Sequence, residues 1–182
     1  FITEPVRSPM IIRDLLTHTS GLSYSINFQS HVDDAYRKIF QISDPTKALV
    51  SDEKVDLEEF TKRIASLPLE FNPGDQWLYS VSIDICARLI EVISGKSIED
   101  YFQENIFDPL GMEDTGFFVK EENLKNLAAC YFRDENKKLH VHDPGAKESR
   151  YAKPREFNGG GSGLISTSFD YFKFLQMLLN GG

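Results

Sequence analysis

Residues 71–80 read FNPGDQWLYS, and this stretch constrains the fold of the chain more sharply than any other. Pro73 and Gly74 occupy the two central positions of a predicted turn. Proline sets the φ angle of the first position, and glycine accepts the positive φ that a type II turn requires at the second. The next three residues, Trp-Leu-Tyr, predict a short extended segment that ends at Tyr79.

A helix is predicted directly after this segment, with Ser80 or Ser82 as its N-cap and apolar residues at helical spacing up to Gly95. The phenol of Tyr79 would then lie at a helix N-terminus, where the helix dipole and free N–H groups stabilise a phenolate. A buried core tyrosine with a satisfied hydroxyl fits the same sequence, so both interpretations stay open here.

Helices dominate the rest of the chain. Apolar residues at helical spacing predict helices at 8–16 with Ser8 as N-cap, 32–42, 57–67 with Asp56 as N-cap, 98–109 after a capping box at 97–100, and 168–179. Short apolar runs predict strands at 116–119, 128–132 and 139–142, the last two forming a hairpin across a turn at 134–136.

Length and composition exclude several classes of protein. The 182 residues are 41% hydrophobic and 26% charged, as in an ordinary globular domain. A net charge of −8 argues against nucleic-acid binding, and no apolar run approaches the roughly 18 residues of a membrane-spanning helix. Because the chain opens on Phe1 and ends on a helix-stop pattern, we expect an excised segment of a longer protein.

Three weaker motifs have ordinary explanations. The glycine-rich residues 158–163 match neither a P-loop nor a dinucleotide fingerprint, so they indicate a close backbone approach, for packing or for a ligand. His140 and His142 would share a strand face, but no third metal ligand lies at a recognisable spacing, which favours a solvated hairpin and no metal. Ser51 and Lys54 match S-x-x-K, but no apolar helix follows Ser51, so we interpret the match as chance.

Four blocks in a fixed order resemble the serine hydrolases of the β-lactamase and penicillin-binding type, particularly class C β-lactamases, D-alanyl-D-alanine carboxypeptidases and family VIII esterases. They are IRDLLTHTSGL (12–22), F-x-PG-x-x-W-x-YS (71–80), IF-x-PLGM-x-x-T (106–115) and GGSGLIST-x-x-D (160–170). The resemblance implies that residues 1–182 form one partial domain. It would be the mainly α fragment, with a small β-hairpin, of an α/β β-lactamase/transpeptidase-like fold.

The resemblance also implies site residues. Tyr79 matches the family tyrosine that shares proton transfer with the lysine of S-x-x-K, and Val81 takes the place of the asparagine of Y-x-N. Valine cannot donate the amide hydrogen bond of that asparagine, which favours esters over β-lactams. Gly161 and Ser162 match a segment near the substrate pocket, whereas the block containing His18 looks structural, so His18 is not expected to be a base.

In the family, S-x-x-K precedes the first block and a K-T-G or H-x-G strand follows the last. The resemblance therefore implies that both are absent from this chain, which would be inactive alone. The parent would be an acyl-serine hydrolase, without a cofactor, that acts on a small-molecule acyl substrate. A β-lactamase or carboxypeptidase proper, or a non-catalytic binding module on the same scaffold, is the alternative. We also expect self-association through the exposed cut face.

Overall fold

The structure is a computed structural model, and it describes residues 3–24, 30–41 and 55–182. Its backbone contacts divide the chain into two compact units, which are described separately. The first unit is Phe1–Ile98 with Glu156–Ser162, and the second is Glu99–Arg155 with Gly163–Gly182. That residues 1–182 form one partial domain stays a prediction.

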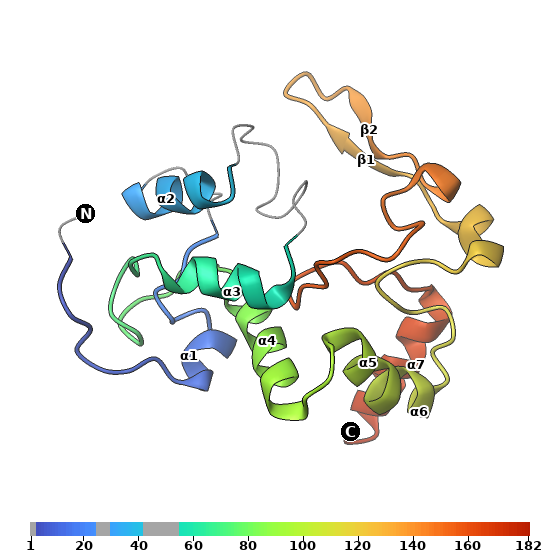
Figure 1. Cartoon of the computed structure of the whole chain (residues 1–182). Helices are drawn as coiled ribbons and strands as arrows, with labels where there is room; N and C mark the ends of the chain where they lie inside the picture. Colours follow the sequence, from blue (N-terminus) through green and yellow to red (C-terminus); the bar gives the residue numbers. More distant parts are fainter. Residues whose placement is uncertain (1–2, 25–29, 42–54) are drawn as a thin grey trace. The chain divides into compact units, whose positions relative to one another are not determined.

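The described part of the first unit contains four α-helices: α1 (Ile12–Leu16), α2 (His31–Ile39), α3 (Leu57–Ala65) and α4 (Ser82–Ser94) (Figure 1). Asp56 is the N-cap of α3, as predicted, because its carboxylate accepts a 2.8 Å hydrogen bond from the backbone N–H of Glu59. Gly95 ends α4 with a φ of 70°, which is the left-handed conformation that favours glycine at a helix end.

The predicted starts of two helices were wrong. Helix α1 begins at Ile12 rather than near Ser8, because the Asp14 carboxylate accepts a 3.0 Å hydrogen bond from the backbone N–H of Ile11 and fixes the first turn there. Helix α4 has Val81 at its N-cap position. The hydroxyl groups of Ser80 and Ser82 are 2.7 Å apart and bond to each other instead of capping the helix.

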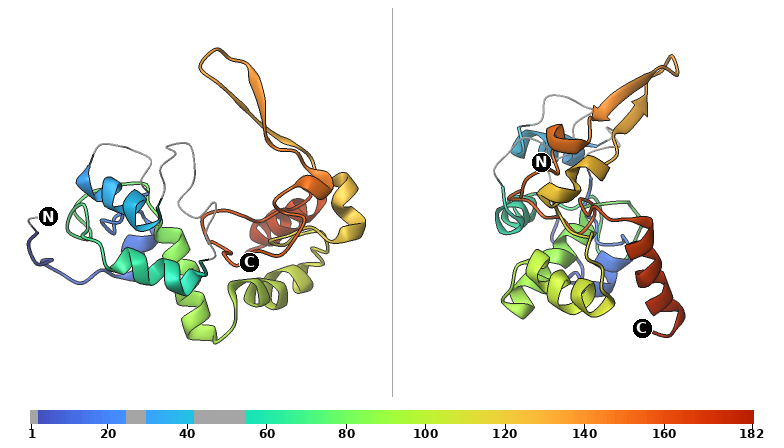
Figure 2. Two further views of the ribbon diagram at one scale, coloured as in Figure 1. Left: turned by 45° about the horizontal axis from the view of Figure 1, so that its top comes forward. Right: turned by 90° about the vertical axis from the view of Figure 1, so that its right-hand side faces the viewer.

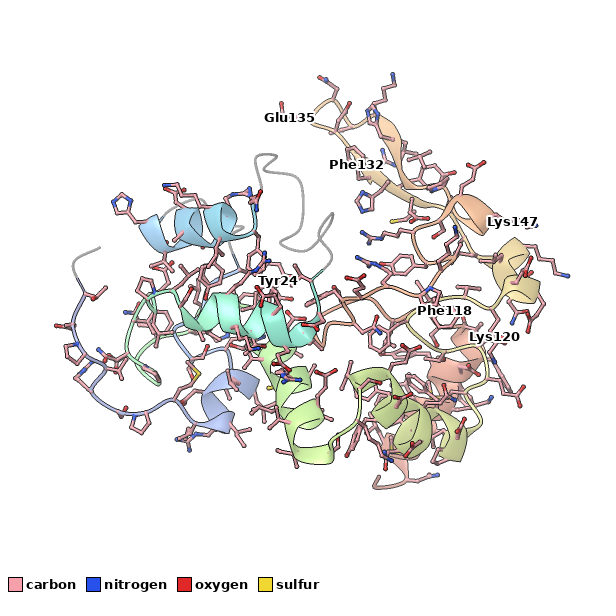
Figure 3. All side chains as sticks on the ribbon, viewed as in Figure 1. Tyr24, Phe118, Lys120, Phe132, Glu135 and Lys147 are labelled. Atoms are coloured by element: carbon pink, nitrogen blue, oxygen red, sulfur yellow. The ribbon has the colours of Figure 1, made fainter. Side chains whose placement is uncertain are left out.

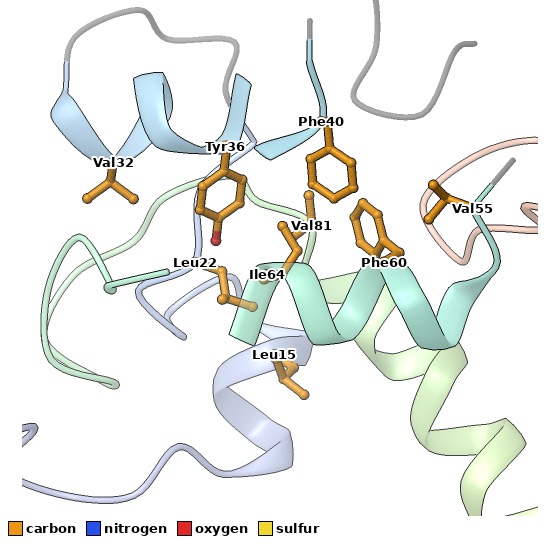
Figure 4. Close-up of a cluster of buried hydrophobic side chains, with 9 residues drawn as sticks. All are labelled: Leu15, Leu22, Val32, Tyr36, Phe40, Val55, Phe60, Ile64 and Val81. Atoms are coloured by element: carbon orange, nitrogen blue, oxygen red, sulfur yellow. The ribbon is translucent and has the colours of Figure 1, made fainter. Parts of the chain in front are cut away.

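The hydrophobic core of the first unit lies between α2, α3 and the segment that enters α4 (Figure 4). The apolar stripes of α2 and α3 meet there, and the rings of Phe40 and Phe60 stack with their centroids 5.2 Å apart. Tyr36, Phe60 and Val81 are at most 1% exposed. Burying one large apolar side chain contributes roughly 1.5–3 kcal/mol to stability, so this cluster holds the helices around the entry to α4.

The second unit begins at Glu99, the second residue of α5 (Ile98–Phe102). Its further elements are a π-helical turn (Gln103–Phe107), α6 (Asp108–Leu110), a 3-10 helix (Glu121–Asn126), β1 (Cys130–Arg133), β2 (Leu139–Asp143), a second 3-10 helix (Ala146–Glu148) and α7 (Ser168–Leu179). The predicted helix over 98–109 is thus confirmed in position but contains a π-helical turn. The predicted span of α7, 168–179, is confirmed.

The predicted hairpin is confirmed. Strand β1 pairs antiparallel with β2, with Tyr131 opposite Val141 and Phe132 opposite His140. The hairpin projects from the rest of the second unit (Figure 2), and Tyr131 and Phe132 are each at least half exposed. The predicted third strand over 116–119 was wrong, since a single bridge joins Gly116 to Ile165.

Asp170 connects α7 to the turn that follows α6 within the second unit. Its carboxylate is almost fully buried and accepts hydrogen bonds from the backbone N–H of Asp114 at 2.8 Å and from the hydroxyl of Thr115 at 3.0 Å. The ammonium group of Lys173 lies 3.0 Å from it. Burial acts to raise the pKa of Asp170, but these donors together hold that pKa below its ordinary value.

The described residues are mostly helical, with one small two-stranded antiparallel sheet, so the predicted fold class is confirmed. Within that same part of the chain, every helix is too short or too polar to span a bilayer.

Candidate active site around Tyr79

Tyr79 lies at the end of an extended segment, three residues before the first residue of α4. Its side chain is 45% exposed. The turn that starts this segment has the predicted geometry. Gly74 has a φ of +90°, and the backbone N–H of Asp75 donates a 3.0 Å hydrogen bond to the carbonyl of Asn72. The first unit therefore presents an accessible phenol next to a helix N-terminus.

The segment around Tyr79 is hydrogen-bonded to the block at residues 12–22. The carbonyl of Thr19 accepts the N–H of Gly74 at 2.8 Å, and the carbonyl of His18 accepts the N–H of Leu78 at 2.9 Å. The imidazole Nδ1 of His18 also accepts the N–H of Ser80 at 3.2 Å. Two blocks separated by about fifty residues in sequence thus form one local structure.

Aromatic side chains surround the phenol of Tyr79. Its ring centroid lies 4.8 Å from that of His18 and 5.4 Å from that of Tyr24. Tyr24, labelled in Figure 3, lies two residues after the end of the 12–22 block. Burial, then the negative charges of Asp84 and of an ionised Tyr79, raise the pKa of Tyr24. Tyr24 was not predicted as a site residue, because it lies in a polar stretch without periodicity.

Asp84 is the buried charged group of the site, in the first turn of α4. Its carboxylate accepts a 3.0 Å hydrogen bond from the backbone N–H of Gly161. Burial raises the pKa of Asp84, and the N–H groups of Gly161 and Gly160 offset part of that rise. A buried carboxylate on the first turn of a helix therefore holds the glycine-rich segment against α4.

The glycines of this segment are required by contact with α4. A Cβ atom at Gly160 would lie 2.3 Å from the carbonyl oxygen of Ile83 and 2.9 Å from the Cβ of Ala87. A Cβ at Gly159 would lie 2.5 Å from the Asp84 carboxylate. The packing explanation of the run is thus confirmed at these two positions, while Gly161 itself is exposed.

Comparison with known proteins shows the family to which this chain belongs. The family model described as Beta-lactamase matches residues 2–182. The chain belongs to the Beta-lactamase family. This family of serine hydrolases includes esterases and acyltransferases, so the predicted resemblance is confirmed.

The proteins to which this Beta-lactamase family chain is similar include the following three. Protein Rv1367c of Mycobacterium tuberculosis is 33% identical over 99% of the chain and 41% of its own length. Lovastatin esterase of Penicillium rubens is 29% identical over 98% of the chain and 42% of its own length. The solved structure of EstCE1, a hydrolase with promiscuous acyltransferase activity, matches with a TM-score of 0.76 and 24% identity over 97% of the chain and 48% of its own. The chain therefore spans less than half the length of these relatives.

The remaining predicted site residues of the Beta-lactamase family chain lie in different environments. Gly161 and Ser162 are exposed, and Gly161 lies beside the Asp84 carboxylate. Val81 instead points into the core and is 1% exposed (Figure 4), so it offers the site neither an amide nor any accessible surface. The roles of Tyr79, Val81, Gly161 and Ser162 in substrate binding or catalysis stay predictions.

The other motifs do not join this site. His140 bonds through Nε2 to the carboxylate of Asp134 at 2.8 Å, on the hairpin. Over the described ranges, no group of three or more His, Cys, Asp or Glu side chains is placed to hold a metal ion. Ser51 and Lys54, interpreted as a chance S-x-x-K match, lie outside the described residues.

A cavity of about 720 Å³ lies within the second unit, and none of its lining residues belongs to the first. Phe118 and Leu164 form part of its apolar wall. The side chains of Lys120 and Asn123, which also line it, already bond to the carbonyl of Glu113 and the carboxylate of Asp114. This cavity therefore contains none of the predicted site residues.

Proposed function

We propose that the complete protein is an acyl-serine hydrolase or acyltransferase of the Beta-lactamase family that acts on small-molecule carboxylic esters. In this proposal residues 1–182 are the central region of one domain, and the nucleophilic serine with its lysine lies outside them. The observation that carries the proposal is the placement of Tyr79, whose phenol is accessible, precedes α4 and is held by the family block around His18.

Tyr79 is proposed to accept the proton of the attacking serine and then to donate one to the leaving group. Free tyrosine has a pKa near 10, so a phenolate needs a stabilising charge. The lysine of the family motif would supply that positive charge, and the N-terminus of α4 would add a smaller favourable field. Proton transfer by a positioned side chain contributes typically about 10²–10⁴-fold to the rate.

Preference for esters over β-lactams is proposed because Val81 stands where penicillin-recognising members carry an asparagine. Two observations support it: the valine side chain is fully buried, and one similar protein is named lovastatin esterase. A Val81→Asn variant would place an unpaired amide in the core, which would lower the stability of the protein by about 1–3 kcal/mol. Any change in its substrate preference could then not be separated from partial unfolding. Substrate comparison is therefore the sharper test.

The experiment measures steady-state hydrolysis of a p-nitrophenyl ester and of a chromogenic cephalosporin by the complete protein. We expect faster turnover of the ester and a fall in kcat of about 10²–10⁴-fold in Tyr79→Phe. Tyr101→Phe, on α5, is the matched control and should leave kcat unchanged. Faster turnover of the cephalosporin would contradict the ester preference. If the wild-type protein turns over neither substrate, the result would instead favour a non-catalytic binding module.

A further inference from the structure

His18 has a backbone conformation that is uncommon for a residue other than glycine. Its φ is +54°, in the left-handed region that non-glycine residues rarely adopt. Such conformations are energetically unfavourable and persist only where surrounding contacts enforce them. The residue also lies within the 12–22 block, which the family resemblance implied to be structural.

Two hydrogen bonds to His18 enclose Tyr79. The carbonyl oxygen of His18 accepts the N–H of Leu78, and its Nδ1 accepts the N–H of Ser80. These donors belong to the residues immediately before and after Tyr79. Two fixed points on either side leave the backbone of Tyr79 little freedom to rotate about its own φ and ψ.

The imidazole ring is itself fixed from two directions. It lies against the ring of Tyr79 at a tilt of 39°, with centroids 4.8 Å apart, and makes an edge-on contact with Trp77 at 6.4 Å. At its Nδ1, the hydroxyl of Ser80 lies 3.2 Å away and is itself 2.7 Å from the hydroxyl of Ser82. Ser80 and Ser82 are buried, so water does not compete for these bonds.

We propose that His18 is a positioning residue for Tyr79: its carbonyl and its Nδ1 hold the two neighbouring amides, and its ring sets the orientation of the phenol. The inference rests on the proposed function of Tyr79 and goes beyond it. His18 is not a base in this scheme, because Nδ1 is occupied as an acceptor. It acts on the reaction through the geometry of Tyr79.

Two substitutions separate the side chain from the backbone. His18→Gly keeps the positive φ without strain and retains the carbonyl that binds Leu78, but removes Nδ1 and the ring. His18→Asn also tolerates this φ and places an amide oxygen close to the position of Nδ1. Thr17→Ala, at an exposed neighbouring position, is the control. All are made in the complete protein.

The first measurement is ester hydrolysis. A small misplacement of a reacting group can cost about 10²-fold in rate, so we expect kcat to fall about 10–100-fold in His18→Gly. KM should change less than about threefold, and His18→Asn should recover most of kcat. Unchanged kcat in His18→Gly, or equal losses in the glycine and asparagine variants, would overturn the proposal.

The second measurement does not depend on turnover. Amide hydrogen exchange followed by NMR compares Ser80, which donates to the His18 side chain, with Leu78, which donates to its backbone and serves as an internal reference. Exchange at Ser80 should accelerate relative to Leu78 in His18→Gly and slow again in His18→Asn. Equal exchange ratios in all variants would refute the positioning role. An inactive wild type with the expected exchange pattern would refute only the proposed function.

Discussion

The carboxylate of Asp84 accepts a hydrogen bond from the backbone N–H of Gly161, which lies 77 residues later in the chain. This contact brings a segment from near the end of the sequence to the first turn of α4, within the first unit. The glycines at 159 and 160 allow that approach because their positions leave no room for a Cβ atom.

Gly160→Ala should destabilise the first unit. The added Cβ would meet the carbonyl of Ile83 and the side chain of Ala87, both on α4, and overpacking of this kind costs typically about 1–3 kcal/mol. Urea denaturation measures the change. Gly116→Ala is the control, since a Cβ there has only an ordinary 3.6 Å contact. Equal stability of the two variants would contradict the packing described here.

Asp84 should make stability fall as the pH rises. Its pKa is raised in the folded protein above the ordinary value of 3.8, so its contribution is fully present below that ordinary value and is lost as the pH rises through the folded value. The free energy of unfolding of the wild type minus that of Asp84→Asn should therefore decrease from pH 4 upward. Urea denaturation at several pH values checks this.

Asp170 provides the control of opposite sign. Its pKa is lowered in the folded protein, so the stability it contributes is present above the unfolded value and is lost as the pH falls through the folded value. The corresponding difference for Asp170→Asn should increase with pH. Differences that change in the same direction for both variants would contradict the assigned environments.

Residues 1–182 alone should be inactive toward esters. In our proposal Tyr79 is present but the nucleophile and its lysine are not, and members of a catalytic unit lose most of their effect when separated. The purified polypeptide is incubated with a fluorophosphonate probe and an activated ester, beside Tyr79→Phe. Stoichiometric labelling of one serine, with turnover that falls in the variant, would contradict the prediction and direct attention to Ser51.

The same polypeptide should self-associate through α7. Phe172, Leu175 and Leu179 recur at helical spacing on this helix and are 58%, 47% and 79% exposed. Exposed apolar surface of this kind promotes association. Sedimentation velocity should show a concentration-dependent species that is weakened in Phe172→Ser. A monomer at all concentrations would refute the prediction.

Local signals in the sequence predicted local structure well. The cap at Asp56, the positive φ of Gly74 and the limits of α7 each depend on a few neighbouring residues, and each is confirmed. The strand over 116–119 failed because a short apolar run does not specify a partner, and only one residue pair forms there.

The candidate site was harder to predict, because its parts come from distant segments. The phenol of Tyr79 was identified from its turn and helix, but its contacts with His18 and Tyr24 follow from long-range packing. Ser20, Ser80 and Ser82 carry no periodic signal, and their pairing depends on where the first block meets α4. The burial of Val81 likewise reflects tertiary packing.

The serine hydroxyls next to His18 form a continuous row of hydrogen-bonding groups. The hydroxyl of Ser80 lies 3.2 Å from Nδ1 of His18 and 2.7 Å from the hydroxyl of Ser82. The hydroxyl of Ser82 lies 2.7 Å from that of Ser20, which accepts from the backbone N–H of Leu22. Neighbouring hydrogen bonds in such a row polarise one another. Because Nδ1 accepts the N–H of Ser80, the proton of a neutral His18 imidazole lies on Nε2, and a single Ser→Ala change would disturb the whole row rather than remove one bond.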